Sequence, residues 1–190
     1  MLFDEHGYHK TSMDDIAQAA GLTKPALYYY TRSKGELIYL IHDQLAEMLW
    51  QRLSQRRSDG VPATDNLREV VYDTISVLES HPGHMRVFFE NFRDLPEDYR
   101  QEVSKKRDRY YGAVLELIHD GVKSGDLETD DPRLTALAFH GMANWSYQWY
   151  RANGRVGLQE IADHLWNFAM FGMSTEVFRA SVRTGPDDAS

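Results

Sequence analysis

The chain has 190 residues, of which 42% are hydrophobic and 26% are charged. This balance is typical of a chain that buries a core, and it excludes wholesale disorder. Because cysteine is absent, disulfide scaffolds, thiol nucleophiles and cysteine-ligated metal sites are excluded. No run of about 18 apolar residues occurs, and the N-terminus lacks the apolar stretch of a signal peptide. We therefore expect a cytoplasmic protein of one or two domains with no membrane partner.

The net charge of −8 is spread unevenly along the chain. Residues 1–57 contain seven Lys or Arg and seven Asp or Glu, whereas residues 58–190 contain fourteen against twenty-two. Within the first part, residues 23–34 include Lys24, Arg32 and Lys34 and no acidic residue. A locally basic N-terminal quarter beside an acidic body is a weak indication of a nucleic-acid surface.

Nearly every segment places its apolar residues three or four positions apart, the period of an amphipathic helix. No segment alternates with period two for long enough to indicate a sheet, so the predicted fold class is all-α. The expected helices cover residues 11–20, 23–30, 34–57, 65–80, 83–94, 96–125, 131–152 and 158–180.

Residues 11–30 form a characteristic local pattern. Thr11 or Ser12 can cap a short helix, and Gly21 supplies the left-handed residue that a sharp reversal needs. Thr23 can cap a second short helix that has a proline in its first turn. Two short helices joined by a tight glycine turn form a helix-turn-helix, whose second helix enters the major groove of DNA. The alternative is an ordinary corner between two amphipathic helices.

The polar residues of this segment are suited to DNA. Hydroxyl and ammonium groups can reach phosphates and base edges, and a small residue permits close approach to a thymine methyl. The predicted DNA contacts are Thr11, Ser12, Thr23, Lys24, Ala26, Tyr28, Tyr29 and Lys34.

Residues 7–37 resemble the DNA-binding segment of the TetR family of transcriptional regulators. The resemblance rests on Gly7, Tyr8, Thr11, Ile16, Ala17, Ala20, Gly21, Leu27, Tyr28, Lys34 and Leu37. It implies a small helix-turn-helix domain, residues 1–57, followed by a larger helical domain, residues 58–190, that binds a small-molecule effector and forms a homodimer. It also implies a ligand-responsive regulator, expected to be a repressor, that binds a palindromic operator. Members of the family have a full first helix before this segment, and residues 1–6 read as the last turn or two of such a helix.

The larger domain combines many aromatic residues with a few polar ones at helical spacing. Such a mixture can line an effector pocket, although the same pattern is common in ordinary cores. Residues 144–150 resemble the subgroup of the family that responds to acyl-CoA thioesters, which makes such a thioester one candidate effector. The predicted ligand-binding residues are Phe88, Phe89, Phe92, Arg107, Tyr110, His140, Asn144, Trp145, Gln148 and Trp149.

The last predicted helix has two apolar stripes, so it is expected to be buried on two sides. In the family, the last two helices pair with their copies in a four-helix dimer interface. The predicted interface residues are Ile161, Leu165, Phe168, Ala169, Gly172 and Met173.

An enzyme and a helical adaptor protein are the two alternative functional classes. Glu116 and His119 form an E-x-x-H pair of the kind that binds metal in di-iron bundles, but a matching second pair is missing. No nucleophile-elbow, P-loop or dinucleotide-binding motif occurs. We therefore expect neither an enzyme nor a cofactor or metal site. A helical adaptor protein without DNA binding is the remaining alternative.

Overall fold

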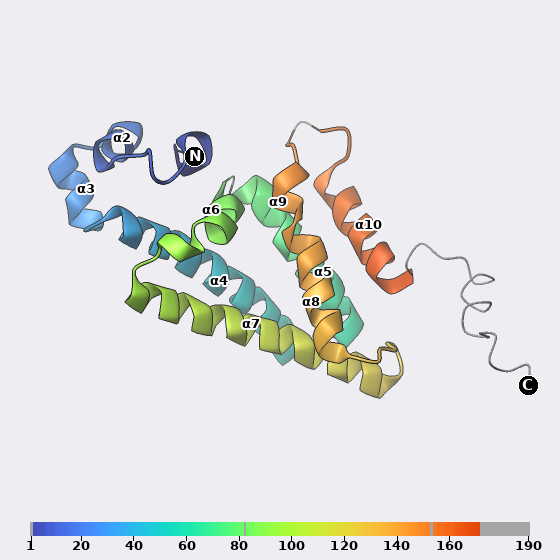
Figure 1. The fold of residues 1–190 in the computed structure, drawn as a ribbon. Coiled ribbons are helices and arrows are strands. Elements are labelled where there is room, and N and C mark those ends of the chain that lie inside the picture. The colour runs from blue at the N-terminus through green and yellow to red at the C-terminus, as the bar shows by residue number, and fades with distance from the viewer. Residues whose placement is uncertain (1, 82, 153, 172–190) are drawn as a thin grey trace, which may run out of the picture.

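The computed structural model describes residues 2–81, 83–152 and 154–171 (Figure 1). These residues form helices and connecting turns without a strand, which confirms the predicted all-α fold. The helices are α1 Leu2–His6, α2 Met13–Ala19, α3 Lys24–Tyr30, α4 Lys34–Ser58, α5 Ala63–Ser80, α6 His84–Glu90, α7 Glu97–Ser124, α8 Pro132–Asn144, α9 Ser146–Trp149 and α10 Leu158–Phe171, with a 3-10 turn η1 at Phe92–Asp94.

The helix predicted over residues 131–152 is interrupted and ends early. α8 ends at Asn144, and the one-turn helix α9 ends at Trp149. The hydroxyl of Ser146 donates to the carbonyl of Ala143 at 2.6 Å, and so competes with the backbone for that acceptor. The amide of Gln148 then donates to the carbonyl of Trp145, which is the tighter 3-10 pattern.

Two other predicted helices differ at their ends. The helix expected over residues 83–94 stops at Glu90, and η1 follows it. The side chain of Asn91 donates to the carboxylate of Asp94 at 2.8 Å and closes this turn. The helix expected to reach residue 180 is α10, and its part beyond Phe171 lies outside the described residues.

The main core lies where α5 packs against α7 and α10, and the long helices α4 and α7 run side by side along the molecule (Figure 1). Apolar side chains at helical spacing on α5 and α7 fill this core. Val71, Ile75 and Val114 have no exposed surface there. Burial of such residues, worth about 1.5–3 kcal/mol each, holds the helices of the larger domain together.

The helices α1 to α3 lie at one end of the molecule, and α4 extends from them into the body (Figure 1). A separate apolar cluster joins this end to the body. It contains Phe3 of α1, Ile38 of α4 and Val87 of α6, together with Leu95 and Val103. The short α1 is therefore anchored to α6 as well as to its own domain.

Candidate DNA-binding surface and ligand cavity

Side-chain caps and one glycine set the geometry of α2 and α3. Ser12 accepts a hydrogen bond from the amide of Asp15, whose carboxylate accepts from the amide of Ser12 in return. This reciprocal capping box fixes the start of α2. Gly21 has a φ of 67°, the left-handed conformation that reverses the chain. Thr23 then caps α3 by accepting from the amide of Ala26.

Most of the predicted DNA-contacting residues lie on the surface of this unit. Tyr28 and Tyr29 are 44% and 86% exposed on α3. Thr23 and Ser12 are exposed at the starts of their helices, and Ala26 is half-buried. The ammonium of Lys24 lies 2.9 Å from the carboxylate of Asp14, an exposed ion pair that competes with any phosphate for Lys24.

The side chains of Thr11 and Lys34, both predicted DNA contacts, bind other groups of the protein in the structure. Thr11 is 2% exposed, and its hydroxyl donates to the carbonyl of Gly7 at 2.8 Å. The ammonium of Lys34 donates to the carbonyls of Tyr8 at 2.7 Å and Thr11 at 2.9 Å, and lies 4.3 Å from the centre of the Tyr8 ring. Both residues therefore stabilise the turn between α1 and α2, and the Thr11 hydroxyl faces the interior.

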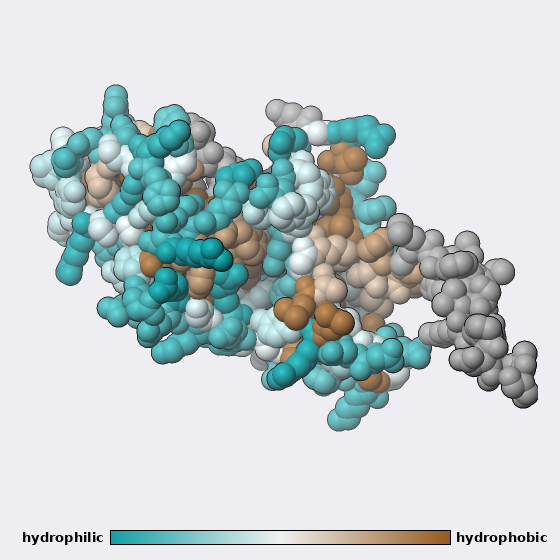
Figure 2. All heavy atoms as spheres, viewed as in Figure 1, coloured by the Kyte–Doolittle hydropathy of each residue, from teal (hydrophilic) through white to brown (hydrophobic). Residues whose placement is uncertain are grey.

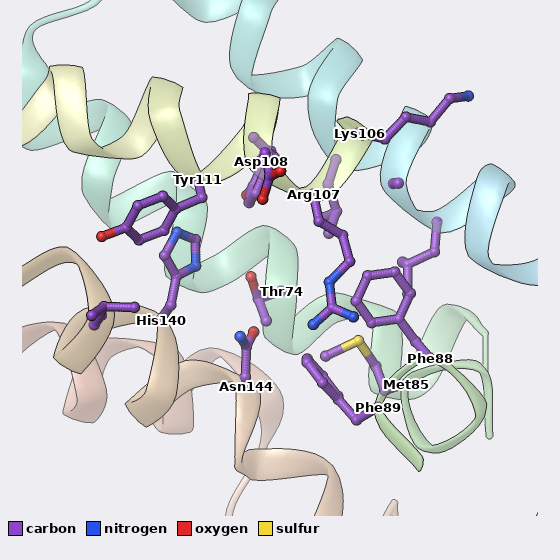
Figure 3. A pocket seen from close by; sticks show the side chains of 15 residues that line it. Thr74, Met85, Phe88, Phe89, Lys106, Arg107, Asp108, Tyr111, His140 and Asn144 are labelled. Atoms are coloured by element: carbon purple, nitrogen blue, oxygen red, sulfur yellow. The ribbon is translucent and has the colours of Figure 1, made fainter. Parts of the chain in front are cut away.

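A cavity of about 280 Å³ lies between α4, α5, α6, α7 and α8 (Figure 3). Six of the ten predicted ligand-binding residues line it: Phe88, Phe89, Arg107, Tyr110, His140 and Asn144. The other lining residues are Leu45, Ala46, Leu49, Thr74, Met85, Lys106, Asp108, Tyr111 and Leu137. Sequence reasoning missed the α4 residues because an apolar stripe on a long helix looks the same whether it packs in a core or lines a cavity.

The other four predicted ligand-binding residues do not line this cavity. Phe92 lies beside it, with its ring centre 4.8 Å from the guanidinium of Arg107. Gln148 donates to the carboxylate of Glu90 at 3.2 Å. Trp145 and Trp149 are 62% and 45% exposed, since the helix break at Trp145 changes the direction of the segment.

Burial sets the electrostatics of the cavity. It lowers the pKa of His140 to about 4, so this ring is neutral near pH 7. Burial also raises the pKa of Tyr110, whose hydroxyl has no hydrogen-bond partner. Desolvation lowers the pKa of Arg107, and the nearby negative charge of Asp108 partly opposes this shift. Arg107 nevertheless remains a cation, because an arginine pKa starts so far above neutral pH.

The outer faces of α8 and α10 are unusually apolar (Figure 2). Leu134 and Leu137 of α8 are 63% and 59% exposed, and Phe168 of α10 is 43% exposed. A second hollow, of about 510 Å³, lies between these helices and the loop before α8. It is lined by Leu67, Ile118, Asp126, Leu127, Glu128, Thr129, Thr135, Ala138, Phe139, Met142, Trp166, Phe168, Ala169 and Met170.

The structure divides the predicted dimer-interface residues into three groups. Phe168 and Ala169 are exposed. Ile161 is 8% exposed in the main core, and Leu165 packs against that core, so these two serve the fold of the subunit. Gly172 and Met173 lie outside the described residues. The exposed leucines of α8 were not predicted for this face.

The E-x-x-H pair does not assemble a metal site in the described part of the chain. The carboxylate of Glu116 lies 2.7 Å from the guanidinium of Arg57. Among the residues that the structure describes, no three His, Asp or Glu side chains are grouped to hold a metal ion. None of the described helices is long and apolar enough to cross a membrane.

The fold and its surfaces define a helix-turn-helix protein with a cavity between the helices of a larger helical domain. Comparison with known protein families leads to the same class of protein. Residues 1–39 match the family described as "Bacterial regulatory proteins, tetR family", and residues 60–173 match the "Tetracyclin repressor-like, C-terminal domain". The chain therefore belongs to the TetR family of transcriptional regulators.

Individual relatives are distant but cover nearly the whole chain. The uncharacterized HTH-type transcriptional regulator YhgD of Bacillus subtilis is 25% identical over 174 residues, covering 90% of this chain and 91% of that protein. The crystal structure of the TetR-family regulator PfmR from Thermus thermophilus superposes with a TM-score of 0.84 at 26% identity, covering 92% and 95% of the two chains. AibR in complex with isovaleryl coenzyme A and operator DNA has the same fold, with a TM-score of 0.79 at 24% identity and coverages of 89% and 92%.

These relationships establish the general activity of the chain. It is a DNA-binding transcriptional regulator of a ligand-responsive family. The prediction that it is not an enzyme is confirmed, because its named relatives are transcriptional regulators.

Proposed function

We propose that this protein is a dimeric repressor that leaves a palindromic operator when a small, largely apolar effector enters the cavity. The position of α6 carries this proposal. Met85 and Phe88 of α6 line the cavity, whereas Val87 of the same helix is buried against Phe3 and Ile38 of the DNA-binding end. An effector that moves α6 must therefore disturb the packing of the DNA-binding unit.

The exposed residues of α3 are proposed to contact DNA. Thr23, Lys24 and Ala26 lie in its first turn, the part of a recognition helix that reaches base edges. Tyr28 and Tyr29 follow, and Ser12 offers a hydroxyl at the start of α2. Lys34 is assigned a supporting role, because its ammonium already binds two backbone carbonyls.

The domain organisation follows from the same arrangement. Residues 1–57 are proposed to bind DNA, and residues 58–190 to bind the effector and to dimerise through α8 and α10. A twofold dimer presents two copies of α3, which requires two half-sites in a palindrome. Such a regulator acts where the chromosome is, which supports placement in the cytoplasm.

The effector class is proposed from the cavity wall. Its lining is mostly aromatic and aliphatic, with one cation and a few hydrogen-bonding groups. An acyl-CoA thioester is one candidate, supported by the resemblance of residues 144–150 and by the ligand of AibR. A cavity of about 280 Å³ holds only the acyl part of such a molecule.

Selection of genomic fragments on the purified full chain, followed by sequencing, tests the DNA part. We expect enrichment of a palindrome, with affinity falling steeply as salt rises because phosphate contacts release counterions. Lys24→Ala should weaken operator binding by about 1–3 kcal/mol, to a degree that varies with the base sequence. Failure to enrich any sequence at any salt concentration would favour the adaptor alternative.

A further inference from the structure

The cavity contains a cation that has no anionic partner in contact with it. Arg107 extends from α7 toward Met85 and Phe89, and its guanidinium carbon lies 5.0 Å from the ring centre of Phe88 (Figure 3). Among the described residues, no hydrogen bond or ion pair is formed by this side chain. Most other arginines on α4 and α7 contact an acid: Arg57 pairs with Glu116, and Arg109 pairs with Glu47.

The other charged groups at the cavity do not neutralise Arg107 by contact. Lys106 is bound to Asp43 and lies 3.6 Å from Glu47, so its charge is already balanced. Asp108 is exposed, and its side chain lies away from the guanidinium of Arg107 (Figure 3). A half-buried guanidinium held against aromatic rings has lost much of its water without gaining a carboxylate.

Two buried polar atoms at the cavity also lack partners. The hydroxyl of Tyr110 and Nε2 of His140 make no hydrogen bond. Thr74 lies close to Tyr110 on the same wall and donates its hydroxyl to the carbonyl of Val70. Buried polar groups are normally satisfied, so unpartnered ones on a cavity wall indicate that a ligand supplies the missing atoms.

We propose that the effector is a free carboxylic acid of medium chain length, whose carboxylate binds the guanidinium of Arg107. The proposal rests on the proposed function in that it takes this cavity as the effector site. The planar fork of a guanidinium matches the two oxygens of a carboxylate. The apolar chain lies along Leu45, Leu49 and Met85, which line the same cavity.

The cavity volume sets the size of this acid. A cavity of about 280 Å³ lies near the lower end of the range of about 300–1,000 Å³ that is typical of small-molecule sites, so it suits a small acid with one short chain. Octanoate, with its two oxygens and eight carbons, is close to this size. In a thioester the carboxylate is replaced by a neutral group, and the phosphates of the coenzyme would lie outside the cavity, so Arg107 would gain no anion.

Calorimetric titration of the full chain at pH 7 tests the proposal with octanoate, octanoyl-CoA and 1-octanol as probes. We expect octanoate to bind at least tenfold more tightly than 1-octanol, because only the acid forms a charge-assisted pair. Arg107→Met should weaken octanoate binding by about 10- to 100-fold and leave 1-octanol unchanged. Lys105→Met, an exposed change on the same helix, is the matched control and should alter neither affinity.

A series of acids from hexanoate to dodecanoate adds a second measurement that needs no variant. Affinity should rise by about fourfold per methylene until the cavity is full, and then level off. The proposal is overturned if none of these acids binds, if octanoyl-CoA binds and octanoate does not, or if 1-octanol binds as tightly as octanoate. Unchanged octanoate affinity in a folded Arg107→Met protein overturns it as well. If that variant does not fold, the comparison of probes on the wild-type chain decides.

Parallel operator-binding measurements separate this proposal from the proposed function. Operator binding without binding of any acid refutes the carboxylate assignment alone. Tight octanoate binding by a chain that selects no DNA supports the assignment and refutes the regulatory role of the cavity.

Discussion

Two neighbouring tyrosines of α7 differ in one respect, the partner of the hydroxyl group. The hydroxyl of Tyr110 is buried and unpartnered, whereas that of Tyr111 donates to the carbonyl of Arg133 at 3.1 Å. Tyr110→Phe should therefore raise the free energy of unfolding of the ligand-free protein by about 1 kcal/mol, because it removes an unsatisfied polar group. Tyr111→Phe should lower it by about 1 kcal/mol. Urea unfolding of both variants measures the difference, and equal destabilisation by the two changes would show that Tyr110 has a partner.

A buried histidine makes the stability depend on pH. His42 has no exposed surface, and burial, aided by the positive charge of Arg107, lowers its pKa from about 6.5 to about 4. Between these values the unfolded chain binds a proton that the folded chain does not. The free energy of unfolding should therefore fall as pH drops from about 6.5 to about 4, by up to about 1 kcal/mol per pH unit for this ring.

Replacement of His42 tests this pH dependence. His42→Leu should reduce the slope of stability against pH in that range, leaving the contribution of His140, whose pKa is also about 4. Urea unfolding at several pH values between 4 and 7 gives the slope. His119→Leu, the same change at an exposed histidine of α7, is the matched control. An unchanged slope in His42→Leu would contradict a neutral buried ring.

At the residue scale, the sequence predicted capping residues better than it predicted the partners of long side chains. Ser12, Gly21 and Thr23 have the local roles expected, because a cap or a turn involves residues only a few positions apart. Lys34 was expected at DNA, yet it binds the carbonyls of Tyr8 and Thr11. That contact joins positions more than twenty residues apart, and a spacing rule cannot foresee it.

At the scale of elements, one glycine controls the angle between α2 and α3. Gly21 has a φ of 67°, and an added Cβ would meet no atom within 4 Å, so the cost of a side chain there is backbone strain alone. Gly21→Ala should destabilise the protein by about 1–2 kcal/mol and weaken operator binding by turning α3. Gly112 lies inside α7 with equally open surroundings and no left-handed φ. Gly112→Ala should instead stabilise the chain by about 1 kcal/mol.

Thermal unfolding and operator titration measure both glycine variants. Equal stabilisation by the two alanines would contradict a left-handed requirement at Gly21. Loss of stability without any loss of DNA affinity would show that the turn does not set the position of α3.

The helical pattern predicted most elements but not the break between α8 and α9. Residues 131–152 keep a helical period throughout, so the pattern gives one helix. The break depends on the hydrogen bond that the Ser146 hydroxyl donates to the Ala143 carbonyl, and the helical period does not encode whether a side chain or the backbone donates to that carbonyl. The same break removes Trp145 and Trp149 from the predicted ligand-binding wall.

At the scale of the whole molecule, the apolar outer faces of α8 and α10 predict a dimer. Leu134 is 63% exposed there, and a monomer would leave this surface in water. Leu134→Asp should shift the protein from dimer to monomer and reduce operator affinity, because a monomer binds one half-site. Sedimentation velocity measures the mass. Leu40→Asp, at a 45% exposed leucine of α4, is the control, and a mass unchanged by Leu134→Asp would place the interface elsewhere.

Communication between the cavity and the DNA-binding end requires contacts on both sides of α6. Besides the cluster around Val87, the ring of His9 lies 3.2 Å from the carboxylate of Asp94, which joins the turn after α1 to η1.

Asp94→Asn removes the charge of this contact and keeps its shape. We expect unchanged effector binding but a smaller effect of the effector on operator affinity, because coupling energies between sites are only about 1–3 kcal/mol in total. Operator titrations with and without effector give the ratio of the two operator affinities. Asp98→Asn, in the exposed first turn of α7, is the control. A ratio unchanged by Asp94→Asn would assign the coupling to the apolar cluster alone.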